Sequence, residues 1–269
     1  MPAMKTIRID ERDLAYREAG TGEPVVLIHA FPLTGEMWRP QFEGLSAAMR
    51  LIAPDLPGFG GSTATEAASV EGWARDVAAL LDALGIGRAI VGGLSMGGYV
   101  AMAFHRLFPE RVKALILADT RAEADPPEVK EKRSGQLRLV AEGRKRELVD
   151  ALLPPLFAPA TLQERLDLVA RVRSLMESVP EAGLSGALAA LRDRPDATAS
   201  LAAAKVPALL LCGALDALTP PEGMRALAEK IPGAKLAVIP EAGHLANLES
   251  PASFSRELAG FVAAVAGLP

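Results

Sequence analysis

The sequence predicts an α/β protein whose mostly parallel central sheet is flanked by helices and interrupted by a helical insertion. Three observations support this fold class. Within residues 1–120, short apolar runs alternate with helical patterns, which is typical of βαβ units. Within residues 121–205 we find no convincing strand pattern, and strand-like runs return after residue 206. We therefore expect a core domain made of 1–120 and 206–269, with 121–205 as a separate insertion.

The first part of the chain contains both edge and buried strand patterns. Apolar and polar residues alternate over Thr6–Ile9 and Asp13–Arg17, which predicts an antiparallel hairpin at a sheet edge. Apolar residues at helical spacing predict helices over Val70–Leu84 and Met96–Leu107, and we expect both to cover the sheet. The predicted parallel strands are Val25–His29, Arg50–Pro54, Arg88–Gly92 and Val112–Ala118.

The insertion reads as helices separated by prolines, and the sheet resumes after it. Charged helical segments cover Glu128–Glu142 and Leu162–Val179. Strands are expected at Ala208–Gly213 and Ala234–Ile239. Between them, Thr219-Pro220-Pro221-Glu222 predicts a helix start, with the threonine as N-cap, a proline at the first helical position and the glutamate completing a capping box.

Composition excludes several classes of function. The formal net charge is −4 and no long basic run occurs, so nucleic acid is not an expected partner. The single cysteine, Cys212, allows no internal disulfide, and with three histidines it leaves little material for a metal site. We expect a cytoplasmic protein with no export signal, no bound metal and no cofactor.

Membrane insertion is not expected either. The longest apolar stretch, Leu258–Pro269, covers 12 residues and is too short to span a bilayer. It follows a helix start at Ser250-Pro251, so it reads as part of a C-terminal helix that packs on the core.

The most informative motif is Gly93-Leu94-Ser95-Met96-Gly97, which lies between a predicted strand and a predicted helix. In this context a G-x-S-x-G sequence forms a sharp turn that exposes the serine hydroxyl, because small residues on both sides let the backbone pass closely. Ser95 is therefore the candidate nucleophile.

Serine needs a base, and the base needs an acid that fixes its tautomer. His244 lies in a loop after the last predicted strand, where it can face a site at the sheet edge. His105 reads as an ordinary helix residue. Asp216 follows the strand Ala208–Gly213, and Asp119, which closes an earlier strand, is a competing acid. We favour Asp216 because of the chain order serine, acid, histidine.

Five segments together resemble the α/β-hydrolase superfamily, within its esterase, lactonase and cofactor-free haloperoxidase group. The segments are His29-Ala30-Phe31-Pro32, Asp55-Leu56-Pro57-Gly58-Phe59-Gly60-Gly61-Ser62, Gly93-Leu94-Ser95-Met96-Gly97, Gly213-Ala214-Leu215-Asp216 and Gly243-His244. The resemblance covers nearly the whole chain outside the insertion. It implies that Ser95, Asp216 and His244 form a catalytic triad, and that the insertion is a helical cap over the site.

The resemblance also implies an oxyanion hole formed by the backbone N–H groups of Phe31 and Met96. Members of the group commonly have glycine after the first histidine of this loop, whereas this chain has Ala30. Alanine tolerates positive φ less well than glycine, so the departure bears on the loop shape. We interpret His29 as a residue that orders this loop rather than as a second base.

The sequence supports hydrolysis of carboxylic esters with short to medium acyl chains, through an acyl-enzyme and without a cofactor. The small-molecule ester or lactone would bind among largely apolar side chains. The candidates for this pocket are His29, Leu94, Leu152, Leu156, Phe157 and Met176.

Two alternatives stay open. A lactonase, or a perhydrolase or haloperoxidase that lets peroxide replace water, would use the same triad. A binding protein that keeps this fold without turnover is a different class. Haloalkane dehalogenases and epoxide hydrolases place an aspartate where this chain has Ser95, which argues against those branches. Nothing in the sequence predicts the oligomeric state.

Overall fold

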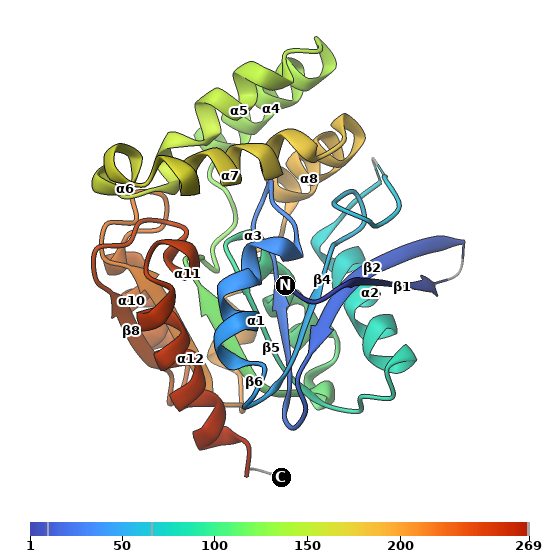
Figure 1. Cartoon of the computed structure of the whole chain (residues 1–269), viewed down its shortest axis with the longest axis vertical. Coiled ribbons are helices and arrows are strands. Elements are labelled where there is room, and N and C mark those ends of the chain that lie inside the picture. The colour runs from blue at the N-terminus through green and yellow to red at the C-terminus, as the bar shows by residue number, and fades with distance from the viewer. Residues whose placement is uncertain (10, 66, 268–269) are drawn as a thin grey trace.

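The computed structural model describes residues 1–9, 11–65 and 67–267, and its centre is an eight-stranded sheet (Figure 1). The strands are β1 (Met4–Ile9), β2 (Arg12–Ala19), β3 (Pro24–Ile28), β4 (Arg50–Pro54), β5 (Ala89–Leu94), β6 (Val112–Ala118), β7 (Ala208–Gly213) and β8 (Lys235–Ile239). Their order is β1-β2-β4-β3-β5-β6-β7-β8. The β1–β2 and β2–β4 pairs are antiparallel and the other pairs are parallel. The predicted α/β class and the edge hairpin are confirmed.

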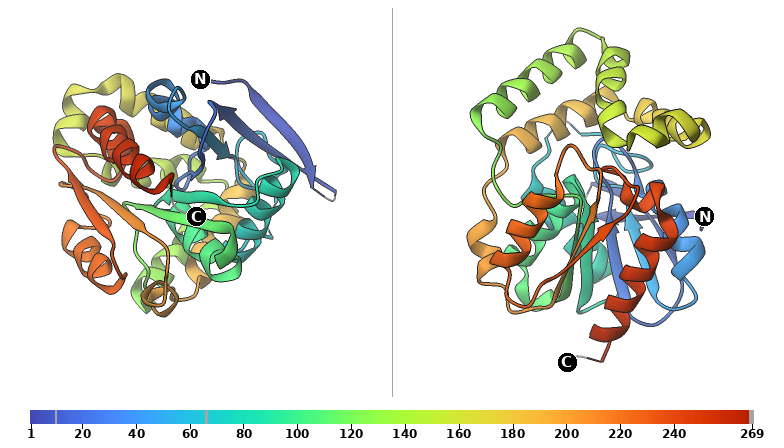
Figure 2. Two further views of the ribbon diagram at one scale, coloured as in Figure 1. Left: turned by 90° about the horizontal axis from the view of Figure 1, so that it is seen from below. Right: turned by 90° about the vertical axis from the view of Figure 1, so that its left-hand side faces the viewer.

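Helices cover both faces of this sheet. On one face lie α2 (Val70–Ala83), α3 (Met96–Leu107) and α10 (Pro221–Lys230); on the other lie α1 (Arg39–Leu45) and α12 (Pro251–Val265) (Figure 2). Successive residues of β3 illustrate the division, since Val26 packs in the cluster that includes α2 and α3, whereas Val25 and Leu27 pack in the cluster with α1 and α12. The central parallel strands β3, β5 and β7 are apolar throughout because both faces of the sheet are covered there.

Between β6 and β7 the described chain forms helices. They are α4 (Pro127–Ala141), α5 (Lys145–Leu152), α6 (Pro159–Glu164), α7 (Leu166–Ser178), α8 (Glu181–Asp193) and α9 (Thr198–Ala202). We call these six helices the helical layer, and α4 to α8 stand at the top of Figure 1, over one end of the sheet. Treating the layer as a separate domain stays a prediction. In the described ranges, no helix is long and apolar enough to cross a membrane.

The described residues also include short helical segments. They are η1 (Gly35–Trp38), η2 (Pro109–Arg111), η3 (Pro154–Leu156) and α11 (Ala246–Glu249). The C-terminal helix is present as α12, although the last two residues of the predicted apolar stretch, 268–269, lie outside the described residues.

Two sequence predictions about helix boundaries are wrong. The single helix expected over Leu162–Val179 is two helices, because the chain is not helical at Arg165, where φ is −123° and ψ is 56°. The helix expected to have Thr219 as its N-cap begins at Pro221, so its N-cap is Pro220, which has no side-chain oxygen to cap it. The Thr219 hydroxyl donates a hydrogen bond to Asp216 instead.

The helical layer approaches the sheet closely where α8 crosses the loop after β4. A Cβ atom at Gly183 of α8 would overlap the carbonyl oxygen of Gly58. Only glycine allows the two backbones to come this near, so Gly183 sets the distance between α8 and this loop.

Replacing Gly183 by alanine should therefore lower the free energy of unfolding by about 1–3 kcal/mol, since the added methyl group must push two backbones apart. Chemical denaturation measures the change. Gly260→Ala is the matched control, because this helical glycine has open space around its Cβ direction and alanine there should stabilise by up to about 1 kcal/mol. Equal effects of the two substitutions would contradict the close approach.

Candidate active site

Ser95 occupies the sharp turn between β5 and α3. Its backbone has φ 55° and ψ −111°, a conformation that residues with a Cβ seldom adopt. The N–H of Ser95 donates to the carbonyl oxygen of Ala118, at 2.9 Å between nitrogen and oxygen. A Cβ at Gly97 would overlap the carbonyl oxygen of Ile28, so glycine is required where α3 starts against β3. The motif thus forms the strained strand-to-helix turn that the sequence predicts.

The two predicted oxyanion donors lie at the start of α3 and after β3. Since α3 begins at Met96, the N–H of this residue belongs to the first helical turn, where amides have no partner within the helix. Phe31 lies in the turn closed by the bond from Leu33 N–H to the carbonyl oxygen of Ala30. Ala30 is not among the described non-glycine residues with positive φ, so the missing glycine causes no strain there.

His244 and Asp216 are brought together by the loops that follow β8 and β7. The Nδ1–H of His244 donates to Oδ2 of Asp216 at 2.8 Å, and both side chains are almost fully buried. This bond fixes the tautomer in which Nε2 of His244 is free to accept a proton. Asp216 and His244 therefore have the geometry of an acid and a base, while the roles predicted for them and for Ser95 stay predictions.

Asp216 also accepts hydrogen bonds from its own loop. The backbone N–H groups of Leu218 and Thr219 donate to Oδ1, and the Thr219 hydroxyl donates to Oδ2 at 2.5 Å. Burial by itself raises the pKa of Asp216, but the charge and hydrogen bond of His244, together with the Thr219 bonds, outweigh it and lower the pKa to about 2.

Asp119, the competing acid, is not bonded to His244. Its Oδ1 accepts a hydrogen bond from the N–H of Gly213 at 2.8 Å, and its side chain is fully buried. The ligand atoms of Asp119, Cys212 and Asp216 lie within 4.8 Å of one another and could in principle hold a metal ion. Asp216 is already bonded to His244, however, and the Cys212 thiol donates to the carbonyl oxygens of Gly213 and Thr219.

Both ring nitrogens of His29 are used within the protein. Nδ1 donates to the carbonyl oxygen of Ala30 at 3.0 Å, and Nε2 accepts from the N–H of Leu56 at 3.1 Å. Its ring also packs edge-on against Phe59. Burial lowers the pKa of His29, which favours this neutral tautomer. His29 thus ties the loop after β3 to the loop after β4, which fits its interpretation as an ordering residue.

His105 lies within α3, as the sequence predicts. It is buried, and burial lowers its pKa.

The other pocket candidates lie in the apolar interior. Leu94, Leu156, Phe157 and Met176 belong to one buried cluster, and Leu152 packs against it. Leu245, the residue after His244, belongs to the same cluster. Of these candidates, Leu156 contacts the His244 loop, since its carbonyl oxygen accepts from the N–H of Leu245 at 3.1 Å. The role of all of them in lining a substrate pocket stays a prediction.

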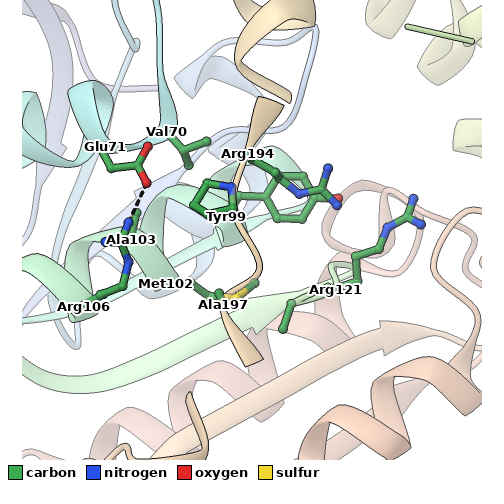
Figure 3. Close-up of a pocket in the computed structure, with 11 residues that line it drawn as sticks. Val70, Glu71, Tyr99, Met102, Ala103, Arg106, Arg121, Arg194 and Ala197 are labelled. Carbon is green, nitrogen blue, oxygen red and sulfur yellow. Dashed lines mark hydrogen bonds and ion pairs between the residues drawn. The ribbon is translucent and has the colours of Figure 1, made fainter. Parts of the chain in front are cut away.

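A separate small hollow lies beside α3 (Figure 3). None of Ser95, Asp216 and His244 lines it. Two of its three arginines are paired: Arg106 with Glu71 at 2.5 Å, and Arg194 with Asp125 at 2.6 Å. The Arg194 guanidinium also stacks on the Tyr99 ring, 4.1 Å from its centre. The lining residues are Val70, Glu71, Tyr99, Met102, Ala103, Arg106, Arg121, Ala122, Arg194, Pro195 and Ala197.

Sequence reasoning missed Glu249, which connects the His244 loop to the helical layer. One carboxylate oxygen accepts from the N–H of Gly243, and the other accepts from the N–H of Ala158 and the hydroxyl of Thr161. These three bonds measure 2.7–2.8 Å, and Glu249 is 8% exposed. In the sequence, Glu249 is only the residue before a predicted helix start. No local pattern indicates that it bonds Ala158 and Thr161, which lie about 90 residues away.

Comparisons with known proteins agree with this architecture. A family model described as alpha/beta hydrolase fold matches residues 23–251. A putative non-heme bromoperoxidase from Mycobacterium tuberculosis is 31% identical over 271 residues, covering 94% of this chain and 98% of that protein.

Two solved structures are also similar over nearly their whole length. A thermophilic esterase from Thermogutta terrifontis, described with malate bound, has a TM-score of 0.94 and 38% identity, covering 98% of this chain and 99% of the other. An enol-lactonase from Burkholderia xenovorans has a TM-score of 0.90 and 28% identity, covering 96% and 100%.

Replacing Glu249 by alanine should lower the free energy of unfolding by about 3–5 kcal/mol, because three buried donors lose their acceptor together. Urea denaturation measures the loss. The control is Glu222→Ala, whose side chain is 81% exposed and whose removal should change stability by less than about 0.5 kcal/mol. If the two variants unfold at the same urea concentration, the proposed importance of Glu249 is wrong.

The low pKa of Asp216 predicts an acid-dependent loss of stability. A carboxyl group whose pKa is lower in the folded state stabilises above its unfolded pKa, and that contribution disappears as pH falls through the folded pKa. Between about pH 4 and pH 2, wild type should lose about 2 kcal/mol from this group. Asp216→Asn should lack that component, and denaturation curves over this range compare the two. Parallel pH dependence in both proteins would contradict the assignment.

Proposed function

This chain belongs to the α/β-hydrolase fold family, and from that premise we propose that it hydrolyses carboxylic esters through Ser95, His244 and Asp216. The observation that carries the proposal is the 2.8 Å bond between His244 and Asp216. These two residues follow β8 and β7, and the strained turn at Ser95 follows β5, so all three lie after the carboxyl ends of parallel strands, at the same edge of the sheet. The esterase from Thermogutta terrifontis, at 38% identity, supports the same choice.

In the proposed reaction, Nε2 of His244 takes the proton from the Ser95 hydroxyl while the oxygen attacks the ester carbonyl carbon. The N–H groups of Met96 and Phe31 stabilise the negative oxygen of the tetrahedral intermediate. His244 then gives its proton to the leaving alcohol, and the acyl group stays on Ser95. A water molecule, deprotonated by His244, releases the acid and restores the serine.

Asp216 stabilises the imidazolium that forms at His244 in both steps. Its carboxylate holds Nδ1–H, so the imidazole cannot rotate or change tautomer during turnover. The lowered pKa of Asp216 keeps the charge in place at neutral pH.

We propose a small-molecule substrate with a short to medium acyl chain. Apart from His29, the predicted pocket side chains are apolar. Leu156 and Phe157 directly precede Ala158, whose N–H is bonded to Glu249. Acyl length would then be set where the helical layer meets the His244 loop. The single buried cysteine supports a cytoplasmic location as part of the proposal.

A second candidate is supported by the names of relatives. The similar enol-lactonase and putative bromoperoxidase suggest that a lactone could replace the ester, or that peroxide could replace water and give a peracid. The same acyl-enzyme serves all three reactions. Bromination of a dye that requires halide, peroxide and a carboxylic acid would favour the peroxide reaction over plain hydrolysis.

Ser95→Ala should reduce hydrolysis of chromogenic esters by about 10⁴-fold or more, because no nucleophile remains, while the fold is retained. A series from acetate upward in chain length measures the preferred acyl group at the same time. A fluorophosphonate probe should label wild type and not the variant. Full turnover by Ser95→Ala would overturn the proposal, and an unlabelled, inactive wild type would favour the binding-protein alternative.

A further inference from the structure

The proposed reaction leaves one buried acid without a role. Asp119 ends β6 with a positive φ of 42°, and its N–H donates to the carbonyl oxygen of Leu211. Its side chain is fully buried. Oδ1 accepts the hydrogen bond from Gly213, but Oδ2 has no partner, although it is shielded from solvent. A buried carboxylate oxygen without a donor is costly, whereas a protonated oxygen could itself donate.

The groups around Asp119 are acidic or neutral. Asp216 and Cys212, from β7 and the loop after it, lie within 4.8 Å, and Glu249 of α11 acts on Asp119 from the His244 side. His244 is one hydrogen bond further away, beyond Asp216. Two charged groups of α10, Glu222 and Arg225, act electrostatically on Cys212 with opposite signs. A second negative charge at Asp119 would therefore repel that of Asp216 at short range.

We propose that Asp119 is a neutral carboxylic acid whose Oδ2–H donates to the Asp216 carboxylate, so that the two side chains share one negative charge. In this arrangement Oδ1 accepts from Gly213, Oδ2 donates to Asp216, and no polar atom of Asp119 is unpartnered. The protonation state of Asp119 does not depend on the proposed function. Only its effect on catalysis rests on that function, and there Asp119 is a positioning residue that acts through Asp216, which contacts His244.

The electrostatics of the two acids agree with this arrangement. Burial, followed by the charge of Asp216, raises the pKa of Asp119 well above its usual value, although the Gly213 hydrogen bond opposes the change. The pKa of Asp216 is lowered to about 2. Since the two pKa values move in opposite directions, the proton stays on Asp119 and the charge stays on the acid that faces His244.

The Cys212 thiol does not compete for this proton. Its Sγ–H is directed at backbone carbonyl oxygens, and burial raises its pKa, so it stays a neutral thiol beside the two carboxyl groups.

The arrangement has a consequence for His244. A donor from Asp119 spreads the charge of Asp216, so the carboxylate stabilises the imidazolium less than a carboxylate without that donor would. Asp119 therefore weakens the interaction between Asp216 and the imidazolium of His244. An ionised Asp119 would do the opposite, because a second negative charge close to Asp216 would add to the stabilisation of the imidazolium.

Two substitutions separate these cases through the acid limb of the pH profile of kcat/KM, which reports a protonation that abolishes activity in the free enzyme. Asp119→Ala removes the donor, so the acid limb should move up by about half a pH unit to one unit. Asp119→Asn keeps an acceptor for Gly213 and an N–H donor for Asp216, so the wild-type acid limb should be restored. An acid limb that moves down in either variant would show that Asp119 is ionised, and would overturn the proposal.

A second measurement requires no activity and no substrate. The infrared difference spectrum between wild type and Asp119→Asn at neutral pH should contain the band of a protonated carboxyl group, which shifts when aspartate carboxyl carbons are labelled with ¹³C. A difference that contains only carboxylate bands would overturn the inference. Asparagine tolerates positive φ, so this variant keeps the backbone of Asp119. If the protein showed no esterase activity, this band would still decide the state of Asp119.

Discussion

The close approach of α3 to the sheet is the constraint on which the site depends. Glycine at position 97 lets the first turn of the helix touch the carbonyl oxygen of Ile28, and this contact forces Ser95 into its strained backbone conformation. The strain persists because β3, β5 and α3 are each fixed by extensive burial. The same contact sets the position of the Met96 N–H beside the serine. A single backbone contact thus positions both the proposed nucleophile, Ser95, and a proposed oxyanion donor, the N–H of Met96.

The proposed acid and base, Asp216 and His244, lie in loops rather than in strands or helices. Hydrogen bonds within these loops must therefore hold them in place. Asp216 is held by Thr219 and by backbone amides, and Gly243, next to His244, is held by Glu249. Because Glu249 also binds the start of α6, the His244 loop and the helical layer form one hydrogen-bonded unit. Displacing the layer would break bonds adjacent to His244. The helical layer is therefore linked through Glu249 to the loop that carries the proposed base.

Two acidic side chains, those of Asp119 and Asp216, are buried after the neighbouring strands β6 and β7. Their environments differ, because Asp216 is hydrogen-bonded to His244 and to donors of its own loop, whereas Asp119 is hydrogen-bonded to Gly213. Similar folds carry esterase, lactonase and haloperoxidase names, so the scaffold alone does not select a reaction. In the proposed function, substrate choice depends instead on the side chains around the Ser95 turn and the His244 loop.

The strand positions, most helix positions and the turn at Ser95 could be predicted from the sequence. Alternation, helical spacing and the G-x-S-x-G pattern are local properties of the chain. The sequence also favoured Asp216 over Asp119 through chain order. Only the tertiary structure decided what the buried polar groups bind. Thr219 was expected to cap a helix and instead bonds Asp216, while Glu249 bonds residues about 90 positions away. These hydrogen bonds depend on which donors and acceptors the folded chain brings within about 3 Å of one another. Those distances cannot be predicted from the local sequence.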